Sequence, residues 1–213
     1  DAISLSQTAE GALSKINDMG QRMRELAVQS ANATNNETDR ASLDAEFQAL
    51  SAEIKRNLEG TSFNGTKLFS ALATMTFQVG ANNAATDQIA VVTADLTKDT
   101  KLTAVLGGAG GANPADIKDA AKSREALEKL DGMLATVNSK RAEFGATQNR
   151  FEAVIQTLQV SAENQTAARS RIMDADFASE TAALTRAQVL QQAGTSMLSQ
   201  ANSLPNNVLS LLR

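Results

Sequence analysis

The sequence predicts a mainly α protein: an elongated coiled-coil helical rod with one small β-hairpin and a protruding C-terminal helix. Aromatic residues make up only 3% of the 213 residues, so the large side chains that dominate globular cores are scarce. Only two prolines occur, so long helices meet few breaks. Apolar residues near positions 127–162 also follow steps of three and four over five repeats, which is the spacing of a coiled coil.

Composition excludes several classes of function. The net charge is −4, which gives no basic surface for nucleic acid. The chain has no cysteine and no histidine, and so lacks the thiolate nucleophile and the commonest general base and metal ligand. We therefore expect no enzyme, no cofactor and no metal. No apolar run of about 18 residues occurs, which predicts no membrane partner, and no cleavable signal peptide opens the chain.

Residues 1–70 are predicted to form two N-terminal rod helices. The first covers about residues 2–32, and the segment "NATNNETD" at 32–39 interrupts it. Thr38 or Asp39 is expected to cap the second helix. The apolar stripe of the first helix consists of Ile16, Met19, Met23, Leu26 and Ser30, and that of the second of Leu43, Phe47, Leu50, Ile54 and Leu58.

Residues 71–122 are predicted to hold the β-hairpin and a short variable insertion. In "TMTFQVGANNAATDQIAVV", residues 74–92, β-branched clusters flank a turn rich in Gly and Asn, which is typical of a hairpin. We expect this to be the only sheet. From Asp95 to Ala121 no periodic pattern is visible, and "GGAGGANP" at 107–114 reads as a flexible surface tract.

Residues 123–178 are predicted to form the long C-terminal rod helix. Its seam alternates steps of three and four residues without a slip. Two polar residues on this seam, Arg141 and Gln148, are interpreted as residues that fix the register of packing. The full seam is Leu127, Leu130, Leu134, Val137, Arg141, Phe144, Gln148, Phe151, Ile155, Leu158 and Ala162.

Residues 179–213 are predicted to form an inner-core polymerisation helix. From Thr181 onward the only charges are Arg186 and Arg213, which is unusual for a helix in water but suits one packed on several sides. Covering five or six apolar side chains would drive assembly by about 10 kcal/mol before entropy is subtracted. The predicted polymerisation residues are Leu190, Met197, Leu204, Val208 and Leu211. The acidic set Asp174, Asp176 and Glu180 just before them is interpreted as helix capping at a break.

A series of motifs covers about residues 1–92 and 123–213. In chain order they are "QRMRELAVQSANATNNETDR", "EIKRNLEGTSFNGTKLF", "FQVGAN", "QNRFEAVIQTL", "ARSRIMDADFASE", "RAQVLQQAGTSMLSQAN" and "LPNNVLSLLR". They resemble bacterial flagellin, the subunit of the flagellar filament. The resemblance implies a coiled-coil rod built from both ends of the chain, with a short insertion at 93–122. It also leads us to expect that an N-terminal inner-core helix precedes residue 1, so that the C-terminal helix is without its partner here.

The resemblance implies a set of partners and a location. The partners are other flagellin subunits in a helical homopolymer, the filament cap and hook-junction proteins, and an export chaperone at the C-terminal helix. The location is the extracellular filament, reached by type III export without a cleaved signal peptide. Flagellins of this kind are also recognised by a flagellin-sensing Toll-like receptor, and matching the motifs places that contact on Arg22, Leu26, Glu46 and Arg150.

Three alternatives to the filament subunit remain open at this stage. Within the family, a hook-filament junction protein shares the helical ends, although "QRMRELAVQSAN" and "VLQQAGTSMLSQAN" favour the filament subunit. A membrane-active amphipathic helix at 181–213 would normally carry Lys or Arg along its polar face, and this one does not. An intracellular coiled-coil adaptor would differ in where the native protein is found.

Overall fold

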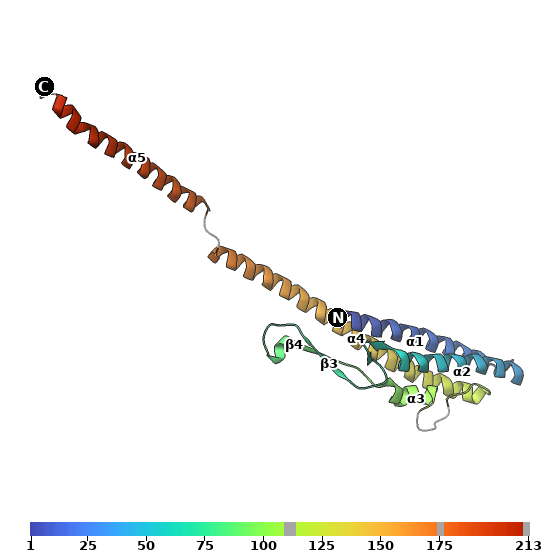
Figure 1. Ribbon diagram of the computed structural model, residues 1–213. Coiled ribbons are helices and arrows are strands. Elements are labelled where there is room, and N and C mark those ends of the chain that lie inside the picture. The colour runs from blue at the N-terminus through green and yellow to red at the C-terminus, as the bar shows by residue number, and fades with distance from the viewer. Residues whose placement is uncertain (109–113, 174–176, 211–213) are drawn as a thin grey trace. The chain divides into compact units, whose positions relative to one another are not determined.

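The computed structural model describes residues 1–108, 114–173 and 177–210, with side chains up to Ala201 (Figure 1). The chain divides into two compact units: an N-terminal unit, Asp1–Thr157, and a C-terminal unit, Leu158–Arg213. The structure is 75% helical, which confirms the mainly α class. Its helices are α1 (Ala2–Ser30), α2 (Glu37–Gly60), α3 (Thr100–Leu106), α4 (Ala120–Met173) and α5 (Phe177–Ser210), with short 3-10 turns η1 (Ala85–Asp87) and η2 (Leu96–Lys98).

Three helices build the core of the N-terminal unit. Figure 1 shows α1, α2 and the first part of α4 side by side. Gly20 of α1 lies against Met133 of α4, whereas Glu10 lies near Gln148, so these two helices run antiparallel. Apolar residues of all three helices are removed from water, which supplies the main driving force for folding this unit. The side chains less than 2% exposed include Leu5, Leu13, Ile16, Met23, Leu26, Phe47, Ile54, Leu58, Leu130, Met133 and Val137.

The turn between α1 and α2 is closed by a capping box. The Asn36 side chain accepts a hydrogen bond from the Asp39 N–H at 2.8 Å, and the Asp39 carboxylate accepts one from the Asn36 N–H at 3.2 Å. Each side chain thereby satisfies an N–H group that the start of a helix leaves free. The prediction that Thr38 or Asp39 is the N-cap was therefore wrong by two or three residues, because Asp39 serves as the third helical residue of this box.

The predicted hairpin at 74–92 is confirmed. Strands β3 (Thr74–Gln78) and β4 (Gln88–Val92) pair antiparallel, with Thr76 opposite Ala90. Along each strand the side chains alternate between the core and water, as a strand covered on one face requires. The Phe77 ring packs edge-on against Phe151 of α4, with 5.7 Å between ring centroids. The hairpin is thus fixed to the long helix by an aromatic contact.

Two predictions for residues 61–122 were wrong. A second strand pair, β1 (Ser62–Phe63) with β2 (Thr66–Lys67), is too short to show alternation, and positive φ angles at Asn64 (48°) and Gly65 (81°) form its turn. The stretch expected to be irregular contains α3, whose start is capped by the Asp99 side chain through the N–H of Lys101 at 2.8 Å. Of the tract predicted to be flexible, residues 109–113 lie outside the described part of the chain.

The seam of α4 differs from its predicted register. The half of the predicted seam that contains Leu130, Val137, Phe144 and Phe151 is buried. The other half is not. Ala126 and Met133, each one position before a predicted seam residue, are buried instead, because α4 meets α1, α2 and the hairpin together rather than a single partner helix. The predicted seam residues Leu127, Leu134, Arg141 and Gln148 are half-buried, and Ile155 and Leu158 are more than 40% exposed.

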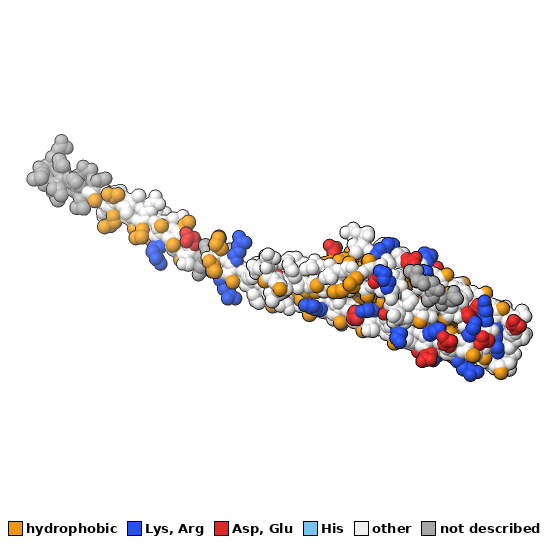
Figure 2. Space-filling model, turned by 90° about the horizontal axis from the view of Figure 1, so that it is seen from below, with side chains coloured by type: hydrophobic (Ala, Val, Ile, Leu, Met, Phe, Trp, Pro, Cys, Tyr) orange, Lys and Arg blue, Asp and Glu red, His pale blue; other side chains and the backbone are white. Residues whose placement is uncertain are grey.

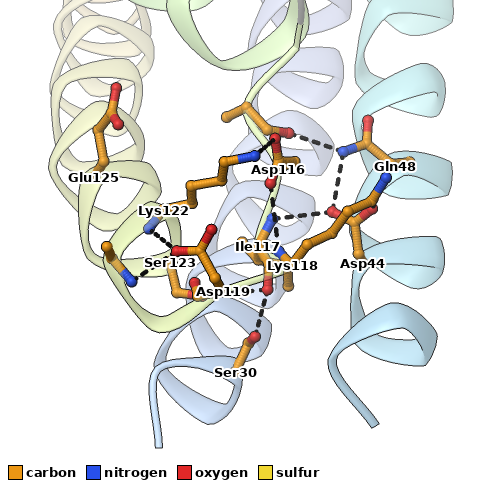
Figure 3. A network of polar contacts seen from close by, with 12 residues as sticks. Ser30, Asp44, Gln48, Asp116, Ile117, Lys118, Asp119, Lys122, Ser123 and Glu125 are labelled. Carbon is orange, nitrogen blue, oxygen red and sulfur yellow. Dashed lines mark hydrogen bonds and ion pairs between the residues drawn. The ribbon is translucent and has the colours of Figure 1, made fainter. Parts of the chain in front are cut away.

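A buried polar cluster ties the segment before α4 to the first two helices (Figure 3). We call residues 115–119 the clasp segment. The Ile117 N–H donates to Asp44 Oδ1 at 2.9 Å, and its carbonyl accepts from Ser30 Oγ at 2.5 Å. Gln48 Nε2 donates to the Ala115 carbonyl at 2.8 Å. Ile117, Ser30 and Asp44 are all buried, so these bonds satisfy polar groups that would otherwise destabilise the end of the unit.

The clasp segment leads directly into a cap on α4. Asp119 Oδ1 accepts the N–H groups of Lys122 at 2.8 Å and Ala121 at 2.9 Å. These bonds, that from Lys122 foremost, hold the pKa of Asp119 below its ordinary value. The Lys122 ammonium lies 3.0 Å from Asp116 Oδ2, and this hydrogen bond raises the pKa of Lys122. The start of the long helix therefore depends on ionised Asp119.

We predict that Gly20→Ala destabilises the N-terminal unit. A Cβ atom at Gly20 would lie 2.9 Å from both Leu134 Cδ2 and Met133 Cε, which is closer than packed carbon atoms allow. These atoms end flexible side chains, but Met133 is fully buried and can move aside only by displacing its neighbours in the core. The overpacking should outweigh the gain in helix propensity and cost about 1 kcal/mol, which lowers the Tm by about 2–4 °C. Gly11→Ala is the matched control, because a Cβ there meets nothing within 4 Å and should raise the Tm. Thermal unfolding followed by circular dichroism tests both, and an equal rise for the two variants would contradict the close approach of α1 and α4.

We predict that the contribution of Asp119 to stability is lost in acid. Since folding lowers the pKa of this carboxyl, its contribution is fully present above the unfolded value, about pH 4, and disappears as pH falls through the folded value. At pH 7 Asp119→Ala should lower the Tm by about 2–4 °C, and the difference from wild type should shrink toward pH 3. Asp119→Asn keeps a neutral cap, so its difference from Asp119→Ala should not vary with pH. A gap between wild type and Asp119→Ala that is the same at pH 3 and pH 7 would refute this reasoning.

Candidate functional surfaces

Arg22 and Glu46, two of the predicted receptor residues, lie side by side on α1 and α2. Arg22 Nη2 is 2.9 Å from Glu46 Oε1, and Arg22 Nη1 donates to Glu25 Oε2 at 3.0 Å. The hydrogen bonds to Glu25 and Glu46 raise the pKa of the Arg22 guanidinium. The Arg22 and Glu46 side chains are 49% and 47% exposed, so a partner can reach them. Glu25 was missed from the sequence, although its three-residue spacing from Arg22 on one helix favours such a pair.

The other two predicted receptor residues do not join this pair. The Leu26 side chain is fully buried in the core, against the prediction that it contributes to a surface contact. Arg24 pairs with Asp131 of α4 at 2.8 Å, which shows the level at which α4 passes this part of α1. Arg150 is exposed, but it follows Asp131 by 19 residues on α4, which is about 28 Å along the helix axis. A contact that includes both Arg22 and Arg150 must therefore be an extended one.

Arg141 and Gln148 both approach Glu10 of α1. Arg141 Nη2 is 3.8 Å from Glu10 Oε1, and Gln148 Nε2 donates to Glu10 Oε2 at 3.3 Å. Both residues lie at the edge of the helix contact rather than on its buried centre. Both residues thus contact Glu10, which is more than 130 residues away in the sequence. A role of Arg141 and Gln148 in setting the register of α1 and α4 stays a prediction.

The C-terminal unit displays large apolar side chains to water. Leu190 and Met197, two of the predicted polymerisation residues, are 66% and 71% exposed. Phe177 is 86% exposed, and it begins an apolar groove that runs along α5 past Ala182 and Val189. Figure 2 shows orange and white side chains along most of α5 and few charged ones. The further exposed apolar residues of this unit are Leu158, Val160, Ile172, Met173, Leu184 and Leu198.

The other three predicted polymerisation residues lie beyond the described side chains. The side chains of Leu204 and Val208 lie outside the described ones, although the backbone of α5 continues through both positions. Leu211 lies outside the described residues altogether. Phe177 and Val189 were missed as parts of the apolar surface, because the predicted stripe through Leu190 and Met197 repeats every seven residues and passes to one side of them.

No group of three or more His, Cys, Asp or Glu in the described part of the chain is arranged to hold a metal ion. None of the helices, over the residues that the structure describes, is long and apolar enough to cross a membrane.

Comparisons with known proteins agree on one family. The model of the bacterial flagellin N-terminal helical region matches residues 1–74, and that of the C-terminal helical region matches residues 127–212. The chain belongs to the bacterial flagellin family. It is 44% identical to a flagellin of Halalkalibacterium halodurans and 39% identical to a flagellin of Bacillus subtilis, in both cases over the whole chain and over 75% and 78% of the relative. It is also 37% identical to the flagellar filament 33 kDa core protein of Treponema phagedenis.

Solved structures agree with this assignment. The flagellin of Bacillus cereus superposes with a TM-score of 0.63 at 32% identity, covering 79% of this chain and 92% of that one. A protein from Vibrio parahaemolyticus described as a flagellar hook-associated protein shares the fold alone, at 15% identity and a TM-score of 0.57. The resemblance to flagellin is thus confirmed, and this flagellin is a structural subunit of the extracellular flagellar filament that assembles with other flagellin subunits.

Proposed function

We propose that this flagellin polymerises by covering the apolar stripe of α5 with neighbouring copies. The stripe consists of Leu190, Met197, Leu204, Val208 and Leu211. The observation that carries the proposal is the exposure of Leu190, Met197, Phe177 and their neighbours on a helix with very few charges. Monomeric proteins rarely expose continuous apolar surface of this extent. Polar residues between them are mainly Gln, Ser, Thr and Asn, which cost less to desolvate than ions.

Different segments of the chain would then have different roles in the filament. Residues 1–70, 71–122 and 123–178 would supply the rod and its hairpin, and residues 179–213 the inner-core contact. The protein would act as a building unit without catalysis of its own. Before assembly the exposed stripe needs protection, so we assign α5 as the segment that an export chaperone covers, on a route that uses no cleaved signal peptide. The filament cap and hook-junction proteins would meet the same helical ends.

We predict that Leu190→Ser combined with Met197→Ser blocks assembly without unfolding the monomer. Both side chains are mostly exposed in the monomer, so helix content should not change. If assembly buries them, their loss should raise the critical concentration for elongation by about 100-fold. The measurement is light scattering after purified monomer is added to sheared filaments.

Leu72→Ser is the matched control for this experiment. Leu72 is 74% exposed but lies in the N-terminal unit, so the same chemical change is made away from α5. Elongation by the double variant at the rate of wild type would contradict the proposed contact.

A second proposed role is recognition of the monomer by a flagellin-sensing Toll-like receptor. The paired and half-exposed side chains of Arg22 and Glu46 support it, since a planar guanidinium beside a carboxylate offers donors and acceptors to a partner. Arg150 would lie at the far edge of the contact, because an interface of about 800 Å² on each side spans a distance close to that between it and Arg22. Leu26 would act from the core, by fixing the face of α1 that carries Arg22.

We predict that Arg22→Ala and Glu46→Ala each weaken receptor binding by about 5- to 100-fold. Exposed ion pairs add little to stability, so helix content and Tm should stay close to those of wild type. Arg56→Ala is the control, because it removes an exposed arginine from another ion pair on α2. Receptor activation should be compared for monomers and for cross-linked filaments at equal subunit concentration. Equal activity of all variants would contradict this placement of the contact. Equal activity of monomer and filament would mean that assembly leaves this surface open to the receptor.

A further inference from the structure

Helix α5 carries only two charged residues, Glu180 and Arg186, between Phe177 and Ser210. At the chain average of 21% charged residues, a helix of 34 residues would carry about seven. The two that remain have opposite signs. A helix so depleted of charge raises the question of what these two groups do when the helix is covered.

The two charges do not satisfy each other within one chain. Both residues are exposed, and neither forms an ion pair with any residue that the structure describes. Charged side chains pair along a helix when they are three or four residues apart. Glu180 and Arg186 are six residues apart, about one and two-thirds turns, so they leave the helix on different sides.

Arg186 lies on the face that assembly is proposed to cover. It precedes Leu190 by one turn on the same side of α5, and it lines the apolar groove together with Ala182 and Val189. An arginine side chain cannot lose its proton in a protein. A guanidinium that is removed from water without a partner is strongly destabilising, whereas one paired with a carboxylate is tolerated. Any neighbour that covers Leu190 must therefore bring an acceptor to Arg186.

We propose that Arg186 of one copy pairs with Glu180 of a neighbouring copy. This inference rests on the proposed polymerisation through α5. Glu180 is the only carboxylate on α5, and in a homopolymer every subunit offers the same acid and the same base, so a single contact satisfies both groups at each interface. Two apolar stripes can pack against each other at several axial offsets. A charge pair at one position fixes the axial register of neighbouring α5 helices.

Charge reversal tests the pair directly. Arg186→Glu and Glu180→Arg are each added, as purified full-length monomer, to sheared wild-type filaments. Each alone should slow elongation by at least about tenfold, because like charges would face each other. The double variant Arg186→Glu with Glu180→Arg should restore elongation from seeds of its own filaments, because on a wild-type seed its first contact would again bring like charges together. So should an equimolar mixture of the two single variants, in which residue 186 of one partner meets residue 180 of the other with opposite charge.

Two controls separate the possible failures. Glu163→Arg makes the same change of charge elsewhere in the C-terminal unit and should elongate as wild type does. Circular dichroism of each monomer should match wild type, since both residues are exposed. Wild-type monomer that fails to elongate would refute the proposed function itself. If wild type elongates, then normal growth of the single variants, failure of both the double variant and the mixture, or rescue of Arg186→Glu by Asp176→Arg instead would overturn the pairing.

Discussion

The packing of α1 against α4 is the constraint on which the rest of the molecule depends. Residues that meet across these helices, such as Arg24 and Asp131, are 107 residues apart in the sequence, and the helices approach closely where position 20 has no side chain. Leu130, Met133 and Val137 of α4 are fully buried. Phe144 and Phe151 lie further along α4 and pack against the rings of Phe69 and Phe77. The hairpin has little core of its own and is held by this helix. Without α4, both α1 and the hairpin would expose their apolar faces.

Much of this fold could be predicted from the sequence, and the failures have physical causes. In a long amphipathic helix the apolar residues recur at a regular spacing, which is why nearly the whole of α1, α2 and α4 could be predicted. The seam of α4 was misplaced because a single-partner heptad was assumed, whereas three elements pack around it and move the buried centre by one residue. Strands of two residues, as in β1 and β2, carry no periodic signal. Leu26 shows the limit for surfaces: a motif match proposes a segment, but only the packed structure shows which of its side chains reach water.

The two units use charge in opposite ways. The N-terminal unit has ion pairs across its helix contacts, such as Arg24 with Asp131, and polar groups that are satisfied within the chain, as at Asp44 and Ile117. These contacts are therefore already made in the monomer. The described part of α5 has exposed apolar side chains and two charged residues that form no ion pair with any described residue. The N-terminal unit is stabilised by contacts within the chain, so the subunit can stay folded alone. Because α5 still exposes apolar side chains, the subunit gains free energy when it joins a polymer.

The sequence distance between Glu10 and Gln148 has a consequence for the order of folding. Their contact closes a loop of 138 residues, whereas Arg22 and Glu46 close one of 24. Closing the longer loop costs about 1.5 kcal/mol more in chain entropy. The contacts that offset this cost form only after α4 has become helical and presents its apolar face. The helical hairpin of α1 and α2 should therefore assemble first and act as the template on which α4 docks. Substitutions at the α1–α4 contact would then mainly change how fast the docked state opens, and those between α1 and α2 how fast the chain first collapses.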